Sequence, residues 1–247
     1  KDSLVLLSIL KKMSETHNFR VIAVTIDEGI PGYRDEALEI VKSFCTKLDV
    51  EFKTYSYKEL YDVTLSESLE LRDEEKTTSC SICGIFRRRA LDHAAEELGA
   101  NVIATGHNLD DSLQTFLINT LSGDSNKIGW MSPGSDSKQI RKIKPLAEIY
   151  ESEIVFYAFT NNLPFQTEPC PHMNEGIRTE IREFLNSIED KHSGIKNNMY
   201  RSIIKISEVM KDSSFKEKRV CANCGNQCTG KICAVCNMVT DLKKQRS

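Results

Sequence analysis

The sequence lacks any hydrophobic run long enough to cross a lipid bilayer. A membrane-spanning helix needs about 20 apolar residues, and no apolar run in the chain reaches that length. No signal peptide opens the chain, so a cytoplasmic location without a membrane partner is expected. Aromatic residues are few, at 7%, but 40% of the 247 residues are hydrophobic, which is ordinary for a globular protein. The length suits one generous α/β domain and a small appendage.

The chain also has little net charge, −3, but this charge is unevenly distributed. Residues 1–190 hold 21 basic and 32 acidic side chains, whereas residues 191–247 hold 12 basic and 4 acidic ones. A basic tail on an acidic body is expected where one end of a protein meets phosphates, which favours a nucleic-acid partner. A merely solvated tail is the alternative.

Hydrophobic periodicity predicts an α/β fold. Helices are predicted over residues 4–13, 35–48, 80–99, 110–123 and 148–161. Strands are predicted over residues 19–27, 50–56, 101–105 and 140–143. Alternating strands and helices indicate a Rossmann-like parallel sheet with flanking helices, whose ligands lie beyond the carboxyl ends of the strands. Those ends are residues 27–29 and 105–107.

The remaining segments are assigned by composition. Residues 123–139 are rich in Gly, Ser, Asp and Pro and are predicted to form a mobile loop. Two more helices, the second one basic, are predicted between residues 176 and 210. Residues 211–219 are predicted to be a linker into the last cysteines.

Nine cysteines are many for such a chain, and six of them form three Cys-x2-Cys pairs. In a reducing compartment such pairs indicate metal binding or redox chemistry. Two pairs, eight residues apart, lie near the C-terminus: Cys221, Cys224, Cys233 and Cys236. Four thiolates on two knuckles suit tetrahedral Zn²⁺, so a zinc ribbon is predicted. The ribbon either only stabilises the tail or also contacts RNA. Cys228 lacks a Cys-x2-Cys partner and is not expected to bind the metal.

The third pair, Cys80 and Cys83, opens a predicted helix, where the helix dipole and free N–H groups favour thiolates. Cys170 stands between two prolines, which fix its backbone as expected for a ligand presented from a loop. Four interpretations stay open here. The three thiolates hold a [4Fe–4S] cluster with one open iron, or they bind zinc together with His172. Alternatively, Cys80 and Cys83 form a catalytic dithiol or persulfide pair, or the cysteines are unrelated.

The order of the motifs resembles a known family. Lys1-Asp2-Ser3 stands directly before an apolar helix, like the last half of the SGGKDS phosphate loop of PP-loop ATP pyrophosphatases. A strand ending in Ile26-Asp27, then CSICG-x2-RRR, ATGHNLDD, EPCP and the four-cysteine tail follow. This series resembles the TtcA/TtuA group of tRNA 2-thiolation enzymes. CSICGIFRRRAL and the tail are most similar to its archaeal and eukaryotic cytosolic branch, which thiolates the wobble uridine. The resemblance covers nearly the whole chain.

The resemblance implies three regions. They are a PP-loop ATP-binding catalytic domain over residues 1–175, a basic helical extension over residues 176–218, and a zinc ribbon with a tail over residues 219–247. Two features of the branch are missing, namely Ser-Gly-Gly before Lys1 and an N-terminal zinc module. The sequence is therefore expected to start inside a longer protein.

The implied activity is that of an ATP-dependent tRNA-uridine 2-sulfurtransferase. In this family ATP, with Mg²⁺, adenylates the C2 oxygen of a uridine and releases pyrophosphate, and sulfide then displaces AMP. Cys80, Cys83 and Cys170 are implied to bind three irons of a [4Fe–4S] cluster, whose fourth iron carries the attacking hydrosulfide. Free sulfide or a ubiquitin-like carrier supplies the sulfur, and the sequence does not distinguish the two. Dimers are common in the family, so a homodimer is an expectation that no particular residue supports.

The ATP site is expected at five residues. The helix N-terminus at Asp2 and Ser3 offers N–H groups to phosphates, and by resemblance the main chain of Ile26 contacts adenine. Gly106 lets the backbone approach ATP closely. Arg87, one helical turn after Cys83, is placed to neutralise phosphate charge beside the cluster.

One acidic residue completes the expected active site. Asp111 matches the essential aspartate of the family and is expected to act as a general base or to orient magnesium or uridine. The neighbouring Asp110 is predicted to be the N-cap of its helix. His107 and His172 are expected to be structural.

Three alternative functions remain. One keeps the fold and the tRNA substrate but uses a persulfide, with zinc or no metal at the central cysteines. The second is a PP-loop ligase or amidotransferase acting on a small molecule, against which the basic tail and the ribbon argue. The third is a non-catalytic RNA-binding partner.

Overall fold

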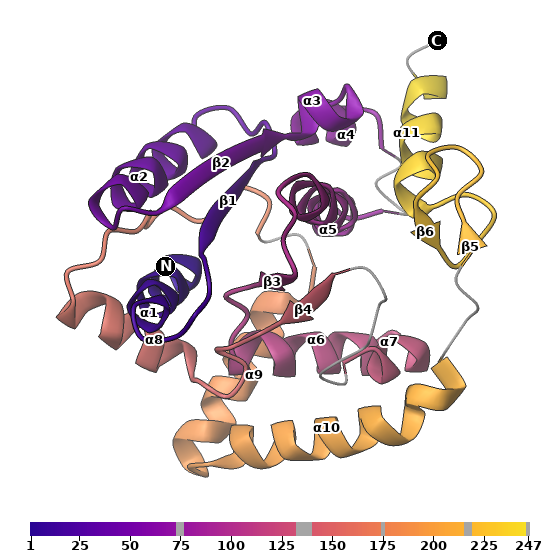
Figure 1. The fold of residues 1–247 in the computed structure, drawn as a ribbon. Coiled ribbons are helices and arrows are strands. Elements are labelled where there is room, and N and C mark those ends of the chain that lie inside the picture. Colours follow the sequence, from indigo (N-terminus) through magenta and orange to yellow (C-terminus); the bar gives the residue numbers. More distant parts are fainter. Residues whose placement is uncertain (73–76, 132–139, 174–175, 215–218, 246–247) are drawn as a thin grey trace.

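The computed structural model describes residues 1–72, 77–131, 140–173, 176–214 and 219–245 of the 247-residue chain. Figure 1 shows its helices and strands. In chain order they are α1 (Asp2–Ser14), β1 (Ile22–Asp27), α2 (Arg34–Lys47), β2 (Glu51–Ser56), α3 (Tyr57–Tyr61), α4 (Leu65–Glu70), α5 (Ser79–Glu97), β3 (Val102–Ala104), α6 (Leu109–Leu121), α7 (Ser125–Gly129), β4 (Arg141–Ile143), α8 (Glu151–Thr160), α9 (Arg178–Lys191), α10 (Ile195–Ser214), β5 (Arg219–Val220), β6 (Gln227–Cys228) and α11 (Ala234–Gln245).

The strands of the α/β part are parallel, as predicted. β1 pairs with β2, with Ile22 opposite Glu51 at one end and Asp27 opposite Ser56 at the other. β3 pairs with β4, with residues 102–104 opposite residues 141–143. Successive side chains of a strand point to opposite faces. Ala23 and Phe52 therefore face α1 and α2, whereas Ile26 and Tyr55 face α5.

Helix α1 is buried on two sides, because four consecutive residues of a helix, here Leu4 to Leu7, point in different directions and all four are buried. Leu4 and Leu7 pack against Phe44 and Cys45 of α2. Val5 and Leu6 pack against α8. The N-terminus of α1 is thus held in place between two other helices (Figure 1).

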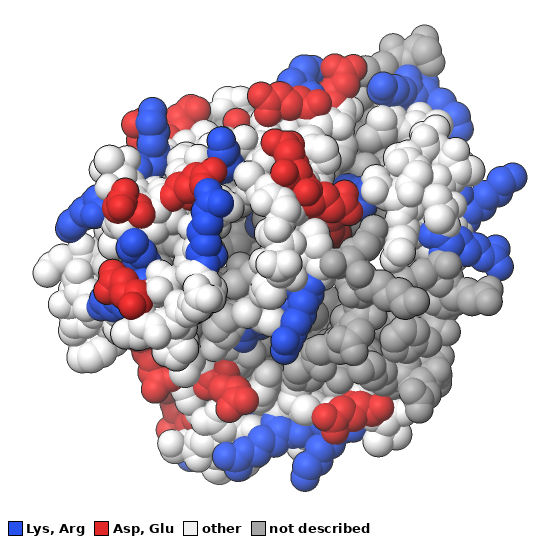
Figure 2. Space-filling model, viewed as in Figure 1, with Lys and Arg blue, Asp and Glu red and all other residues white. Residues whose placement is uncertain are grey.

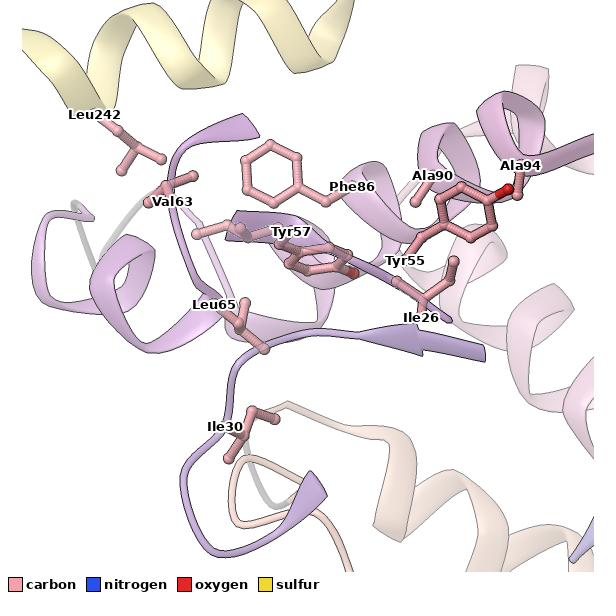
Figure 3. Close-up of a cluster of buried hydrophobic side chains, with 11 residues drawn as sticks. Ile26, Ile30, Tyr55, Tyr57, Val63, Leu65, Phe86, Ala90, Ala94 and Leu242 are labelled. Atoms are coloured by element: carbon pink, nitrogen blue, oxygen red, sulfur yellow. The ribbon is translucent and has the colours of Figure 1, made fainter. Parts of the chain in front are cut away.

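Helix α5 is the centre of the main hydrophobic cluster (Figure 3). Phe86, Ala90 and Ala94 on one face of α5 are fully buried. The small alanines leave room for Tyr55 of β2, and Phe86 packs edge-to-face on Tyr57 with ring centroids 5.4 Å apart. Because Cys83 also packs against this cluster, α5 positions that cysteine relative to β1 and β2.

The regions after residue 175 pack onto the α/β part. Ile181 and Leu185 of α9 and Ile203 of α10 share a buried cluster with Leu109 and Leu113 of α6. Leu242 of α11 is buried in the same cluster as Phe86. The C-terminal helix therefore packs against α5 (Figure 1).

Two predictions about loops were wrong in part. Within the predicted mobile loop 123–139, residues 125–129 form α7, whose N-cap Asp124 accepts a hydrogen bond from the Lys127 N–H; residues 132–139 lie outside the described part. Within the predicted linker 211–219, α10 continues to Ser214, and residues 215–218 are not described. Across the described ranges, no helix combines the length and the hydrophobicity that a bilayer crossing requires.

Candidate active site and metal centres

The N-terminus of α1 meets the loop after β3. Gly106 lies so close that a Cβ there would be 2.8 Å from the Ser3 nitrogen and 2.9 Å from the Asp2 carbonyl carbon. Only glycine permits this approach of two backbones. Gly106 was predicted to allow approach to ATP, and in the structure its close neighbour is the backbone of Asp2 and Ser3.

Asp2 has a buried carboxylate oxygen that needs a partner. Within the described ranges Oδ1 receives no hydrogen bond, and its nearest cation is Lys1, whose Nζ lies 3.4 Å away. Burial raises the pKa of Asp2, while Lys1 opposes this shift. A carboxylate oxygen of this kind is suited to a metal ion, and the adjacent helix N-terminus is suited to a phosphate group.

Asp111 lies at the third position of α6 and closes its capping box. Its N–H donates to Asn108 Oδ1 at 2.9 Å, and its Oδ2 accepts from the Asn108 N–H at 3.2 Å. Asn108 is therefore the N-cap, and the prediction that Asp110 caps this helix was wrong. The capping box fixes Asp111 at the end of α6 that faces Asp2.

Asp111 interacts electrostatically with three titratable groups. The pKa of His107 is lowered, mainly by burial and secondly by the charge of Lys144. The charge of Asp111 opposes this shift. Burial also lowers the pKa of Lys144, and Asp111 again opposes the shift. Because Asp111 also raises the pKa of Asp2, its carboxylate lies near all three groups. Lys144, which follows β4, was not selected from the sequence.

Asp110 has a different role from the predicted cap. Its Oδ1 lies 2.5 Å from Lys196 Nζ, and its Oδ2 accepts a hydrogen bond from the Glu151 N–H at 2.8 Å. Lys196 Nζ also donates to Asn186 Oδ1 at 2.7 Å. This buried pair joins α6 to the first residues of α8 and α10.

The sulfur of Cys83 lies among polar groups. Arg87 Nη2 donates to it at 3.4 Å, and the Tyr57 hydroxyl lies 3.6 Å from it while donating to the Cys83 carbonyl at 2.8 Å. Burial raises the pKa of the Cys83 thiol, and Arg87 and Tyr57 oppose that shift. The sequence predicted that the helix dipole and free N–H groups favour a thiolate at this position, and in the structure desolvation of Cys83 acts against that effect.

Arg87 is also tied to the end of β1. Its Nη2 lies 2.5 Å from Oε1 of Glu28, a buried carboxylate. Glu28 Oε2 lies 2.8 Å from Arg34 Nε, and the Arg34 guanidinium donates to the Ile26 carbonyl at 3.1 and 2.6 Å. The Ile26 carbonyl, expected beside adenine, thus already accepts hydrogen bonds from Arg34. Neither Glu28 nor Arg34 was selected from the sequence.

The three central cysteines come from two distant segments of the chain. Cys83 and Cys170 both pack against the cluster around α5, and the charge of Cys170 contributes to the raised pKa of Cys83. Cys80, one turn earlier on α5, is exposed. No three of Cys80, Cys83, Cys170 and His172 have ligand atoms within 4.8 Å of one another. These residues are therefore not arranged around a single metal ion.

The C-terminal cysteines form the one four-ligand group found among the described residues. The sulfurs of Cys221, Cys224, Cys233 and Cys236 all lie within 4.8 Å of one another. Tetrahedral Zn–S bonds of 2.3 Å give sulfur separations of about 3.8 Å, and Cys224 and Cys233 are 3.7 Å apart.

Backbone groups favour the thiolate at one of these four cysteines. N–H groups of Cys224 and Cys233 lower the pKa of Cys221 to about 6. Cys228 instead directs its thiol to the Gly230 carbonyl at 3.0 Å. The first knuckle connects the antiparallel strands β5 and β6. The four cysteines fit Zn²⁺ in a zinc ribbon.

Comparison with known proteins agrees with this geometry. A model of the PP-loop domain matches residues 1–189. The chain belongs to the PP-loop domain family. Its α/β fold with parallel strands is the fold of that family.

Relatives of this PP-loop chain share most of its length. The tRNA 2-thiolation protein NcsA of Haloferax volcanii is 32% identical, over 98% of this chain and 80% of the relative. Cytoplasmic tRNA 2-thiolation protein 1 of Lodderomyces elongisporus is 33% identical, over 100% of this chain and 73% of the relative.

A solved structure also matches the PP-loop chain. It is that of the U34-tRNA thiolase NcsA from Methanococcus maripaludis with its [4Fe-4S] cluster. The two structures superpose with a TM-score of 0.81 at 28% identity, over 98% of this chain and 77% of that one. The resemblance inferred from the motifs is thereby confirmed.

Proposed function

We propose that this chain is an ATP-dependent tRNA-uridine 2-sulfurtransferase that acts on the wobble uridine through a [4Fe–4S] cluster. One observation carries the proposal. Cys83 and Cys170 pack against the same hydrophobic cluster, and Arg87, which donates to the Cys83 sulfur at 3.4 Å, also contacts Glu28 directly after β1. Cysteine thiolates next to a cation, at the edge where parallel strands end, suit an iron–sulfur site beside a nucleotide.

The residues present fit ATP. The first N–H groups of α1 can bind phosphate oxygens, and Asp2 Oδ1, which receives no hydrogen bond within the described ranges, can bind Mg²⁺. Gly106 keeps the loop after β3 against this helix end. Ile26 and Arg87 complete the proposed nucleotide site, with Arg87 offering its half-exposed guanidinium to phosphate charge.

The residues also fit a cluster better than a single metal ion. Thiolates of a cluster bind separate irons, so their sulfurs are farther apart than around one zinc ion. The sulfurs of Cys80, Cys83 and Cys170 do not all lie within 4.8 Å of one another, whereas those of the C-terminal cysteines do. The wider spacing agrees with a cluster. When bound, the cluster would supply iron coordination that can hold and deliver sulfur.

The chain's own residues divide the remaining work. Asp111, fixed by its capping box, can accept a proton or orient Mg²⁺ or the uridine. Adenylation of the C2 oxygen by ATP releases pyrophosphate, and sulfide then replaces the oxygen as AMP leaves. Arg87 can stabilise the charge on the phosphate during both steps.

A tRNA partner is supported by the surface charge. In Figure 2, Lys and Arg side chains gather along the lower edge, over α10, and at the right, over the ribbon. Arg201, Lys205, Arg219 and Lys231 are exposed on these two elements. Phosphate contacts of this kind position an RNA without reading its sequence. We propose the division into residues 1–175, 176–218 and 219–247, with the last two regions facing tRNA.

Three further assignments extend the proposal. The sulfur comes from sulfide or from a ubiquitin-like carrier, the active form is a homodimer, and the location is the cytoplasm, as the name of the yeast relative says of that protein. Each follows from the family and not from a particular contact in this chain.

The test is a thiolation assay under anaerobic conditions. The reconstituted protein, with tRNA, ATP, Mg²⁺ and sulfide, is expected to form 2-thiouridine and one pyrophosphate per thiolated base. Mass spectrometry of digested tRNA identifies the base and its position. Thiolation by iron-free protein would favour persulfide chemistry, and pyrophosphate release that ignores tRNA would favour a small-molecule ligase.

A further inference from the structure

Glu28, directly after β1, is a buried acidic residue between two arginines. Its side chain is 1% exposed. A buried carboxylate is tolerated when it is paired, and Arg34 alone, at 2.8 Å, would neutralise it. Arg87 adds a second cation at 2.5 Å. Two cations therefore contact one buried carboxylate.

Each arginine also contacts a second group. Arg34 donates to the Ile26 carbonyl, at the end of β1. Arg87 uses the same nitrogen, Nη2, for Glu28 and for the Cys83 sulfur 3.4 Å away. Glu28 offsets one of these two positive charges, and the Cys83 sulfur is the other group that Arg87 contacts. Glu28 is thus the centre of a continuous chain of contacts from β1 to the sulfur.

The position of Glu28 is itself fixed. The Leu65 N–H at the start of α4 donates to the Glu28 carbonyl at 2.7 Å. Arg87, by contrast, has a side chain that is 51% exposed, and a long arginine at the surface loses rotamer freedom when it is held in one place. Contact with the fixed carboxylate of Glu28 restricts this freedom.

We propose that Glu28 is a positioning residue that holds the Arg87 guanidinium against the Cys83 sulfur and links that sulfur to the end of β1. The inference rests on the proposed function, because it assigns the Arg87–Cys83 contact to a cluster-binding cysteine. The buried carboxylate of Glu28 acts on the sulfur through its contact with Arg87.

The effect can be measured at the cluster. Hydrogen bonds to cysteine sulfur and nearby positive charge raise the reduction potential of an iron–sulfur cluster. Glu28→Asp keeps the charge but withdraws the carboxylate by one methylene, so Arg87 is released. We expect a more negative potential, in the same direction as in Arg87→Met, and no further shift when Glu28→Asp is added to Arg87→Met.

The experiment is a redox titration of the anaerobically reconstituted full chain, followed by electron paramagnetic resonance. Glu39→Asp, the same change at an exposed position of α2, is the matched control and is expected to leave the potential unchanged. Glu28→Gln is the second variant, used in the same cycle if Glu28→Asp does not fold. The change in reduction potential caused by Glu28→Gln is expected to be more negative in the wild-type background than in the Arg87→Met background.

The outcomes separate the two proposals. Equal shifts from a Glu28 substitution in both backgrounds would overturn the positioning role and leave the cluster intact. A wild-type chain that takes up no iron would overturn the proposed function together with this inference. A shift confined to the background that contains Arg87 supports both.

Discussion

Replacing Lys196 with methionine is expected to lower the free energy of unfolding by about 3–5 kcal/mol, because it leaves a buried carboxylate unpaired. Lys196 and Asp110 are each 4% exposed and lie 2.5 Å apart. Asn186 loses a donor as well. Urea unfolding of the zinc-loaded protein measures the change.

Two variants separate this pair from a general effect of charge. Lys205→Met removes an exposed lysine from the same helix and is expected to change stability by no more than about 0.5 kcal/mol. Asp110→Asn added to Lys196→Met removes the orphaned charge while keeping an acceptor for the Glu151 N–H, and should restore part of the loss. Equal losses from the two lysine variants would contradict the account.

Asp111→Asn is expected to reduce the rate of 2-thiouridine formation by about 10²- to 10⁴-fold, the range typical of a lost acid–base group. The amide oxygen can still accept from the Asn108 N–H, so the cap of α6 and the fold should survive. Single-turnover thiolation at saturating ATP gives the rate, and thermal unfolding gives the stability.

The matched control is a carboxylate with the same local structure. Glu153 accepts from the Tyr150 N–H at 3.0 Å at the start of α8, as Asp111 does on α6. Glu153→Gln should therefore change neither rate nor stability appreciably. A rate within a few-fold of wild type for Asp111→Asn would show that the carboxylate only caps its helix.

Much of the fold was predictable because its signals are local. The period of the apolar residues located α5 and β1 to within about three residues of Ser79–Glu97 and Ile22–Asp27. The knuckle spacing predicted the C-terminal metal site, since short turns bring each pair of sulfurs together. These features depend on neighbours in the sequence.

Some errors were avoidable. Ser56 with Glu59, and Thr64 with Glu67, form capping boxes at the starts of α3 and α4. This pattern is readable from the sequence, yet neither helix was predicted. Asn108 with Asp111 is the same kind of box with an aspartate at the third position. Reading it would have corrected the assignment of Asp110.

Other features could not be predicted, because they join residues far apart in the chain. Glu28 and Arg87 are 59 positions apart, and Asp110 and Lys196 are 86 apart. A charged residue in the sequence is ordinarily on the surface. Only the packing of α5 against β1, and of α10 against α6, buries these carboxylates and supplies their partners.

The most direct test is metal and acid-labile sulfide analysis of anaerobically purified wild type beside Cys170→Ala. The account predicts iron, sulfide and zinc in the wild type. In the variant it predicts loss of iron and sulfide with zinc retained by Cys221, Cys224, Cys233 and Cys236. Iron that persists in Cys170→Ala, or zinc that falls together with it, would contradict two separate metal centres and the chemistry built on them.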